Sequence, residues 1–426
     1  MSDVTILGFG PAGASAAIAA HDAGAHVTVL ERMPYGGGNC LNSGGFLVEV
    51  GGPGAIDHLD ALCFGKTPRD VLAAFADGLH EVPGWLASLG GETREVQIPG
   101  LTPSWPHFPG ETTYRQFVGD PPGPALFDCL RRAVEARGID VRYGERVTEL
   151  PPGPVVLACG GFEYDEELRD AYLPLPLTAV GHPGNTGDGL RLAQAAGASL
   201  WHMSAFFGWF AFRHPDHVAA FPLDVHAPSF LYVDADGRRF ADETGWEVHD
   251  KLRCLTAYLP RRANRPHMPG YIVFDEPARL AGPLNGVVGT PNDYVWSADN
   301  SAELAAGWIE PVESLDLPEL ERTLQEYGAV PDGDVPDEFG RDPSTIVPLE
   351  PPLYAIEMHP GVATASGGPR RDARARVLRS DDAPIPGLYA AGGCGSIWGH
   401  LTEHGGGLAD AIVFGRIAGE QAATAS

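Results

Sequence analysis

The sequence predicts an α/β fold, and three observations support this prediction. The chain opens with a short apolar run at residues 4–7, which leads into a glycine-rich turn and an alanine-rich helical pattern. A second apolar run at residues 26–30 ends in an acidic residue. A third, in VVLACGGF at residues 155–162, again leads into glycines. Short, continuously apolar strands that alternate with helices are typical of a parallel sheet with helices on both faces.

Composition and charge limit the possible partners. The chain has 426 residues, is 44% hydrophobic and carries a net charge of −27. This suits a globular protein and argues against nucleic acid or an anionic membrane surface as a partner. No apolar run is long enough to span a membrane, and the chain opens in a strand pattern instead of a leader peptide, so we expect a cytoplasmic protein. The six cysteines form no C-x-x-C pair, and no metal site is predicted.

The first strand, turn and helix carry a dinucleotide-binding pattern. Gly8, Gly10 and Gly13 complete G-x-G-x-x-G. The first glycine makes the tight turn, the second lets a pyrophosphate approach the backbone, and the third lets helix pack on strand. Glu31, which ends the second strand, is placed to accept hydrogen bonds from both ribose hydroxyls. Because a carboxylate there disfavours a 2′-phosphate, the pattern predicts FAD or NAD and not NADP.

The residues that follow decide between FAD and NAD. The stretch ERMPYGGGNCLNSGGF (31–46) resembles the G-G-N-x-x-x-S-G-G stretch of the fumarate reductase/succinate dehydrogenase flavoprotein family, which includes the 3-ketosteroid dehydrogenases. The resemblance recurs, in the family's order, at residues 155–162, 182–200, 231–243, 384–396 and 395–419. It implies FAD as the cofactor. It also implies a Rossmann-like FAD-binding domain of the glutathione reductase type with an inserted α+β cap domain.

The motif and the resemblance together give a set of expected FAD-binding residues. They lie in the glycine turns, at the ends of the strands and in the last helix: Gly8, Gly10, Pro11, Ala12, Gly13, Glu31, Arg32, Gly38, Asn39, Asn42, Ser43, Gly44, Gly45, Val147, Ala158, Cys159, Gly160, Asn185, Gly187, Asp188, Gly392, Gly393, Gly406, Gly407 and Leu408. Membrane-bound members of the family attach FAD through a histidine. Gly38 falls at that position here, so we expect noncovalent FAD.

The glycine turn near the end of the chain has two explanations. In the family, this turn and the helix after it present backbone N–H groups to the flavin, and the positive helix end stabilises the anion of the reduced flavin. Gly406, Gly407 and Leu408 are the candidates for that role. The alternative is that the glycines only permit close packing of the helix.

The resemblance also implies a cofactor domain interrupted by the cap. Residues 1–200 are its first part, residues 346–426 complete it, and residues 201–345 are the substrate-binding cap. Within the cap, the sequence predicts a strand pair around an Asp236–Gly237 turn, a strand in GYIVFDE, a helix in SAELAAGW and an irregular loop at residues 331–343. Because no second G-x-G-x-x-G follows, no dedicated NAD(P)H site is predicted.

Residues that would bind a dicarboxylate are replaced in this chain. The family's fumarate reductases carry a histidine where this chain has Ala363 and Thr364, and an arginine where Thr402 falls. Their proton-donating arginine is expected in TGWEVHDK, which holds His249 and no arginine. We therefore do not expect a small dicarboxylate substrate. The aromatic stretch LWHMSAFFGWFAF (200–212) is either a buried domain junction or a hydrophobic substrate wall, which would favour an alicyclic or steroid-like ketone.

Flavin chemistry on a C–C bond next to a carbonyl requires a base for the α proton and donors that stabilise the carbonyl oxygen. His404 is the first candidate for the acid/base or carbonyl-binding group. Glu403 either orients a neighbour or is a solvated carboxylate. The further candidates are Tyr354, which matches a family position near the flavin, His249, and His400, which a core position explains equally well.

Three main functions remain open at this point, beside a flavin hydroxylase, for which the sequence has no added NAD(P)H-handling motif. One is an FAD-dependent α,β-dehydrogenase of a cyclic, largely apolar ketone or acid, which passes electrons to oxygen, a quinone or another carrier. Another is the reverse reaction, an ene-reductase supplied by an external donor. The third is a catalytically silent flavoprotein, against which the ionisable residues at the last glycine turn argue.

Overall fold

The computed structural model of the chain describes residues 2–97, 103–244, 247, 249–261, 263–285, 292, 294–333 and 336–425. The chain divides into two compact units. The first comprises residues 1–174, 181–207 and 362–426, and the second comprises residues 175–180 and 208–361. The predicted domain boundaries after residues 200 and 345 remain a prediction.

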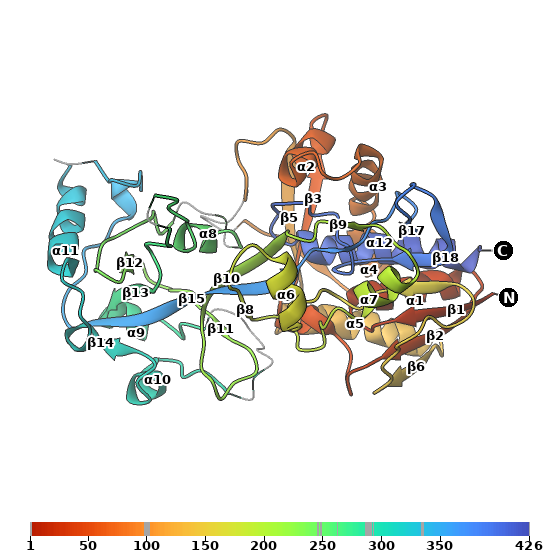
Figure 1. Ribbon diagram of the computed structural model, residues 1–426, viewed down its shortest axis with the longest axis horizontal. Helices are drawn as coiled ribbons and strands as arrows, with labels where there is room; N and C mark the ends of the chain where they lie inside the picture. Colours follow the sequence, from red (N-terminus) through yellow and green to blue (C-terminus); the bar gives the residue numbers. More distant parts are fainter. Residues whose placement is uncertain are drawn as a thin grey trace. The chain divides into compact units, whose positions relative to one another are not determined.

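A six-stranded sheet forms the centre of the first unit. Its red strands lie close to the N-terminus and its blue strands lie close to the C-terminus (Figure 1). The strand order is β17 (Arg376–Leu378), β18 (Pro384–Ala390), β7 (Val155–Leu157), β1 (Asp3–Leu7), β2 (His26–Glu31) and β6 (Asp140–Tyr143). All neighbours are parallel except β17, which pairs antiparallel with β18. The predicted α/β class is confirmed.

Two small-residue helices pack closely beside this sheet. Helix α1 (Pro11–Asp22) and helix α12 (Gly406–Ala423) approach each other at two glycines of α12. A Cβ atom at Gly415 would lie 2.5 Å from the carbonyl oxygen of Ala12, and one at Gly419 would lie 2.2 Å from that of Ala16. The absence of side chains at these two glycines therefore allows the first and last helices of the unit to touch.

The remainder of the first unit surrounds this α/β core. A three-stranded antiparallel sheet has the order β3 (Phe46–Gly51), β5 (Glu111–Phe117) and β4 (Thr93–Glu95). The other elements are η1 (Gly38–Asn42), α2 (Ala55–Cys63), α3 (Arg69–Leu79), α4 (Val82–Ser88), α5 (Pro122–Ala136), α6 (Glu166–Tyr172), α7 (Asp188–Ala195) and the strand pair β9 (Leu200–Trp201) and β16 (Gly368–Pro369). Of all the helices the structure describes, none is long and apolar enough to cross a membrane.

The second unit is built on an antiparallel sheet. Its order is β11 (Phe221–Pro222), β10 (Phe206–Phe212), β15 (Leu353–Ala365), β13 (Gly270–Asp275) and β12 (Phe230–Asp234), and β8 (Thr178–Ala179) and β14 (Glu310–Pro311) also pair with β15. The boundary between the units falls within β10 and β15. The helices are α8 (Leu252–Leu255), α9 (Glu276–Leu280), α10 (Ser301–Ala305) and α11 (Leu320–Ala329), with short 3-10 turns η2 (Val312–Ser314), η3 (Val330–Asp332) and η4 (Pro343–Thr345).

The predicted strand pair around Asp236–Gly237 is only half formed. Strand β12 precedes the turn, but beyond it a single bridge joins Arg239 to Val233. The guanidinium of Arg239 pairs with the buried carboxylates of Glu243 and Asp337. Because an ion pair inside the unit satisfies this side chain, the chain leaves the sheet after one bridge and does not continue as a second strand.

Candidate functional site

The expected cofactor residues follow the carboxyl ends of parallel strands in the first unit. Gly8 follows β1, Glu31 ends β2, Ala158 follows β7 and Gly392 follows β18. The sheet order reverses at β1, because β2 lies on one side of it and β7 on the other. Open α/β sheets bind their ligands at the carboxyl edge next to such a reversal. Chain topology therefore gathers residues from distant parts of the sequence at one edge.

The three glycines of the first turn have different surroundings. Gly8 has a positive φ of 101°, and a Cβ atom there would lie 2.4 Å from the carbonyl oxygen of Ala158. At Gly13 it would lie 1.9 Å from the carbonyl oxygen of Gly8. At Gly10, in contrast, nothing comes nearer than Gly37 at 3.7 Å. Gly8 and Gly13 are thus required for packing, whereas Gly10 leaves open space that suits a pyrophosphate at the start of α1, where Pro11 and Ala12 lie.

Glu31 is a buried acid held by backbone donors. Its Oε2 accepts the N–H of Phe9 at 2.7 Å and its Oε1 accepts the N–H of Met33 at 2.8 Å. Burial raises the pKa of its carboxyl, and the hydrogen bonds from Met33 and Phe9 oppose that rise. Each carboxylate oxygen has a second lone pair, so both oxygens keep acceptor capacity for the predicted ribose hydroxyls.

An ion-pair network lies next to this acid. The carboxylate of Asp188, the first residue of α7, pairs with Arg32 at 3.2 Å and with Arg146 at 2.8 Å. Val147 is partly buried against the core on that side of the sheet. Gly187, the residue before α7, has a φ of 72°, and its N–H donates to the carbonyl oxygen of Gly161. Arg32 and Asp188 thus hold one another, which leaves their direct role toward a cofactor a prediction.

The second glycine turn offers one spare donor. The Oγ of Ser43 donates to the carbonyl oxygen of Cys40 at 2.9 Å and accepts the N–H of Gly45. A Cβ atom at Gly44 would lie 2.6 Å from the ring of Phe46. The buried Nδ2 of Asn42 finds no hydrogen-bond partner within the described part of the chain. A buried donor of this kind costs free energy unless a ligand or water pairs with it, so Asn42 fits a polar cofactor.

Two expected cofactor residues, Asn185 and Asn39, share a hydrogen-bond partner, Glu163, that was not predicted from the sequence. The Nδ2 of Asn185 donates to Oε1 of Glu163 at 2.6 Å, and the Nδ2 of Asn39 does so at 3.2 Å. Glu163 lies three residues after Gly160, and the sequence signal was its acidic side chain directly behind an apolar strand and a glycine pair. The acid is fully buried.

The remaining residues at the ends of β7 and β18 shape the same edge. The Sγ of Cys159 donates to the carbonyl oxygen of Leu7 at 3.2 Å. At Gly160, with a φ of 70°, a Cβ atom would lie 2.2 Å from Oδ1 of Asn185. At Gly393 the nearest atom would be the backbone nitrogen of Gly161 at 3.4 Å. The two turns face each other with no side chain between them. Gly38 and Gly10 are also close, since a Cβ atom at Gly38 would lie 3.9 Å from the Cα atom of Gly10.

The last glycine turn has a packing reason as well as a possible cofactor role. A Cβ atom at Gly405, with its φ of 80°, would lie 2.7 Å from the backbone of Phe46, and one at Gly406 would lie 2.5 Å from the ring of Trp398. The N–H of Gly406 donates to the carbonyl oxygen of Glu403. Gly407 and Leu408 lie in the first turn of α12, where N–H groups have no acceptor within the helix. Those two residues can still donate to an anion.

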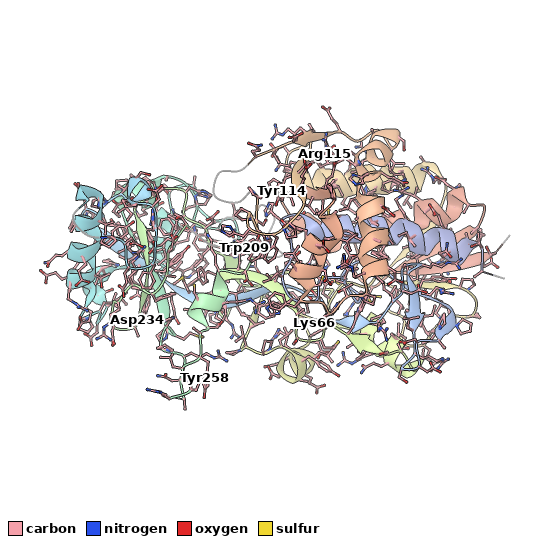
Figure 2. All side chains as sticks on the ribbon, turned by 90° about the horizontal axis from the view of Figure 1, so that it is seen from above. Lys66, Tyr114, Arg115, Trp209, Asp234 and Tyr258 are labelled. Atoms are coloured by element: carbon pink, nitrogen blue, oxygen red, sulfur yellow. The ribbon has the colours of Figure 1, made fainter. Side chains whose placement is uncertain are left out.

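Glu403 is not a solvated carboxylate. It is 1% exposed, and its oxygens accept hydrogen bonds from Nε2 of His58 at 2.7 Å and from the hydroxyl of Tyr114 at 2.7 Å. Tyr114 lies on β5 beside Arg115 (Figure 2). Burial and the charge of Glu403 raise the pKa of Tyr114 to about 12. Sequence reading missed His58 and Tyr114, which hold the last glycine turn in place through this acid.

His404 follows this acid directly. It is 7% exposed, its N–H donates to Oγ of Ser104 at 3.3 Å, and its ring lies 4.4 Å from the ring of Phe46. His400, four residues earlier, stacks on the ring of Phe64 at 4.1 Å. The two histidines therefore have separate aromatic neighbours.

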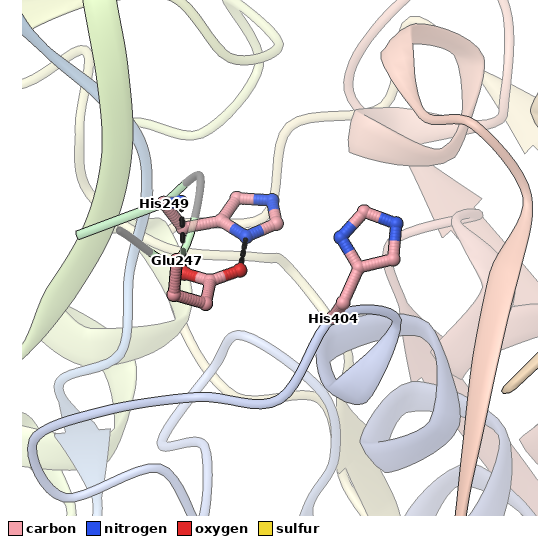
Figure 3. Close-up of side chains that lie close together, drawn as sticks. All are labelled: Glu247, His249 and His404. Carbon is pink, nitrogen blue, oxygen red and sulfur yellow. Dashed lines mark hydrogen bonds and ion pairs between the residues drawn. The ribbon is translucent and has the colours of Figure 1, made fainter. Parts of the chain in front are cut away.

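The other two catalytic candidates belong to the second unit. The Nδ1 of His249 lies 2.8 Å from Oε1 of Glu247 (Figure 3), and the ring of His249 packs edge-on against Trp209 at 4.6 Å. Tyr354 lies on β15, with the guanidinium of Arg279 5.7 Å from its ring. Burial raises the pKa of Tyr354. His249 thus carries an acidic partner suited to orienting an imidazole. Tyr354 has both a carboxylate, Glu276, and a cation, Arg279, beside it.

Comparisons with known proteins extend these observations. The sequence matches the family described as the FAD binding domain over residues 3–153 and 131–408. A probable fumarate reductase of Shewanella frigidimarina is 28% identical over 99% of this chain and 75% of its own length. The 4-oxocyclohexanecarboxylate 2-dehydrogenase of Sinomonas cyclohexanicum is 29% identical over 92% and 87%. The crystal structure of a 3-ketosteroid Δ1-dehydrogenase from Sterolibacterium denitrificans covers both chains completely, with a TM-score of 0.82 and 20% identity.

Proposed function

The chain belongs to the FAD binding domain family, and from this premise we propose that it removes hydrogen from a C–C bond next to a carbonyl. It is an FAD-dependent oxidoreductase, as the fumarate reductase and ketosteroid dehydrogenase relatives are. The observation that carries the proposal is the last glycine turn. There, a histidine and the first N–H groups of α12 follow one another directly in the chain. A proton-transfer group beside oxyanion donors is what α-proton removal from a ketone requires.

We propose a cyclic, largely apolar ketone or acid as the substrate. The chain has Thr402 where fumarate reductases carry an arginine, and the carbonyl oxygen of Thr402 accepts the indole N–H of Trp105 at 2.9 Å. Thr364 stands near the position of their histidine, and its hydroxyl accepts a hydrogen bond from Asn39. These positions supply no cation for a second carboxylate. A relative whose name gives 4-oxocyclohexanecarboxylate as its substrate supports a cyclic ketone.

In the proposed reaction, the histidine, the helix N-terminus and the buried acid of the last glycine turn have different roles. When bound, FAD supplies the acceptor for the hydride. His404 removes the α proton or donates to the carbonyl oxygen. The first N–H groups of α12, at Gly407 and Leu408, stabilise negative charge together with the positive end of the helix. Glu403 positions this turn through His58 and Tyr114 and does not itself move a proton to the substrate.

The reverse reaction is the second candidate. Reduction of an enone would use the same residues in the opposite direction and would require an external electron donor. The fumarate reductase relatives, which reduce a C–C double bond, favour this alternative. In either direction an external electron donor or acceptor completes the cycle.

Anaerobic flavin spectroscopy tests the proposal. We expect cyclic ketones to bleach the flavin of the oxidised protein, and cyclic enones to reoxidise the photoreduced protein. Succinate and fumarate serve as matched dicarboxylate substrates that the site does not accept. Bleaching by succinate, or reoxidation by fumarate with no response to any cyclic ketone or enone, would contradict the proposed substrate class.

A further inference from the structure

Glu163 is a buried acid of the first unit that the proposed reaction does not use. It lies between β7 and α6 and is 0% exposed. Besides the amides of Asn39 and Asn185 on Oε1, the N–H of Ala365 donates to its Oε2 at 3.3 Å. Across the part of the chain that the structure describes, its carboxylate forms no ion pair. Burying a carboxylate that has hydrogen-bond donors but no cationic partner costs free energy, so its presence here calls for a functional explanation.

The fold makes space for this carboxylate with two glycines. A Cβ atom at Gly161 would lie 2.4 Å from Oε2 of Glu163. One at Gly181 would lie 3.1 Å from Oε1 and 2.4 Å from the carbonyl oxygen of Ala363. A side chain at either glycine would displace the acid. The acid and its surroundings are therefore one built arrangement within the unit.

The acid joins three segments that the cofactor site needs. Asn39 belongs to η1, and its Nδ2 also donates to the carbonyl oxygen of Ala363 at 2.9 Å. Its Oδ1 accepts the N–H of His182 at 2.6 Å. Asn185 lies close to Gly160 and shares Oε1 of the acid with Asn39. One carboxyl group thus contacts both amides, and it is the shortest hydrogen-bond partner of Asn185.

We propose that Glu163 is a positioning residue of the FAD site, and that its negative charge opposes FAD binding, so that protonation of this acid strengthens binding. The proposal rests on the proposed cofactor roles of Asn39 and Asn185. FAD carries a negatively charged pyrophosphate, which we place at Gly10, and Gly38 lies beside Gly10. Because Glu163 contacts Asn39, the residue after Gly38, its ionised carboxylate repels the pyrophosphate across a buried region with little screening. The neutral acid keeps its shape and its amide contacts without that repulsion.

The neighbours of Glu163 keep their charge while it titrates. Burial raises the pKa of Glu163 to about 7, against the opposing effect of its hydrogen bonds. On the 181–185 segment, burial lowers the pKa of His182 to about 4. At the residue after Glu163, burial raises the pKa of the Tyr164 hydroxyl above its usual range. On α6, the guanidinium of Arg169 donates to the carbonyl oxygen of Glu163 at 2.7 Å. Near neutral pH, Glu163 is the group of this set that changes charge.

Binding of FAD to the full-length apoprotein at several pH values tests this proposal. The dissociation constant is measured by flavin fluorescence for the wild type, Glu163→Gln and the control Glu167→Gln, whose side chain is 93% exposed on α6. We expect the wild type and the control to bind FAD about tenfold more weakly at about pH 8 than at about pH 6, a differential equal to about one pKa unit. Glu163→Gln, which keeps the shape without the charge, is expected to bind equally at both.

The positioning role has its own variant. Glu163→Ala removes a shared partner of both amides and is expected to weaken FAD binding about tenfold to a hundredfold even at the lower pH, the usual cost of leaving a buried donor without its partner. Apoprotein unfolding curves show whether each variant folds. Wild-type affinity in Glu163→Ala, or wild-type pH dependence in Glu163→Gln, would overturn the proposal.

A fourth variant provides the test in case neither Glu163→Ala nor Glu163→Gln folds. Asn185→Ala leaves the acid in place and removes its shortest hydrogen bond, which favours the ionised form. The midpoint of the pH dependence of FAD binding is then expected to move upward, and an unchanged midpoint would contradict the proposal. FAD binding requires no substrate, so a failure to oxidise any ketone would overturn the proposed function and leave this result standing.

Discussion

His404 and His400 are the same residue type on the same stretch of chain, and only one of them directly precedes the glycine turn. If His404 is the acid/base group, His404→Ala keeps FAD and slows reduction of the flavin by substrate by about 10²- to 10⁴-fold, the usual contribution of a positioned proton-transfer group. The control His400→Ala removes a ring that stacks on Phe64 and is expected to keep near-normal rates. Stopped-flow flavin bleaching at matched FAD content measures both. Equal rates in the two variants would contradict the assignment and favour His249 or Tyr354.

His202 is a buried histidine whose effect on stability depends on pH. Burial lowers its pKa from the ordinary 6.5 to about 4, and its Nδ1 lies 2.8 Å from the carbonyl oxygen of Ser396. Above pH 6.5 neither the folded nor the unfolded form carries the proton. As the pH falls from 6.5 toward 4, the unfolded form binds a proton that the folded form does not, and the free energy of unfolding decreases.

The His202→Asn variant isolates this effect, because asparagine tolerates the left-handed backbone at this position, with a φ of 54°. On acidification, the wild type is expected to lose stability relative to this variant by up to about 1.4 kcal/mol per pH unit. All other titrating groups are common to both proteins and cancel. Denaturant unfolding at a series of pH values measures the difference. The matched control, His26→Asn, changes a side chain that is 70% exposed and is expected to show no such trend.

At the scale of elements, the approach of α12 to α1 depends on glycine. Gly419→Ala would place a Cβ atom 2.2 Å from the carbonyl oxygen of Ala16, and we expect it to lower the free energy of unfolding by about 1–3 kcal/mol, as overpacking does. Gly84→Ala makes the same change in α4, where a Cβ atom meets nothing within 4 Å. That control is expected to gain up to about 1 kcal/mol from helix propensity. Denaturant unfolding curves measure both, and shifts of the same sign would contradict the packing argument.

The elements that the sequence predicted best carry local signals. The first two strands end where the glycine turn and the acid predicted, at Leu7 and Glu31. The first helix begins at Pro11, because proline is favourable in the first turn of a helix. Strand β15 was not predicted, since its sequence contains Pro360 and Gly361, which ordinarily interrupt strands.

The parts of the site that could not be predicted are contacts between distant residues. His58 and Glu403 are 345 residues apart, and Asn39 and Glu163 are 124 apart. Glycine spacing and a terminal acid reveal a nucleotide site because their pattern is local. The acidic side chain of Glu163 behind an apolar strand and a glycine pair is a weak local signal, and the acid is identified as buried only when the fold brings its donors to it.

At the scale of the whole molecule, every expected FAD residue lies in the first unit. A ligand that binds only the folded form stabilises it by about 2.7 kcal/mol at a hundredfold excess over its dissociation constant. Hydrogen exchange is therefore expected to slow on FAD addition in residues 1–174, 181–207 and 362–426. Gly10→Val is the matched control. A Cβ atom at this position meets nothing nearer than 3.7 Å in the protein, and the valine side chain blocks the pyrophosphate, so the variant is expected to fold without this added protection. Protection confined to residues 208–361 would contradict the cofactor site.

Unfolding of the whole molecule also tests how FAD is held. Because Gly38 stands where membrane-bound relatives of the family carry the linking histidine, acid or heat is expected to release intact FAD. Filtration of the denatured protein followed by fluorescence of the filtrate measures the released cofactor. Flavin that stays on the polypeptide would contradict noncovalent binding.

The packing of α12 against α1 has a consequence for how the protein folds during its synthesis. The hydroxyl of Ser2 donates to the carbonyl oxygen of Ala423 at 2.6 Å, across 421 residues of sequence. A ribosome-bound chain therefore has its first glycine turn long before the helix that completes the cofactor edge. We expect FAD capture to wait until translation has passed α12, so that the nascent protein depends on chaperones for longer than a domain built from consecutive segments does.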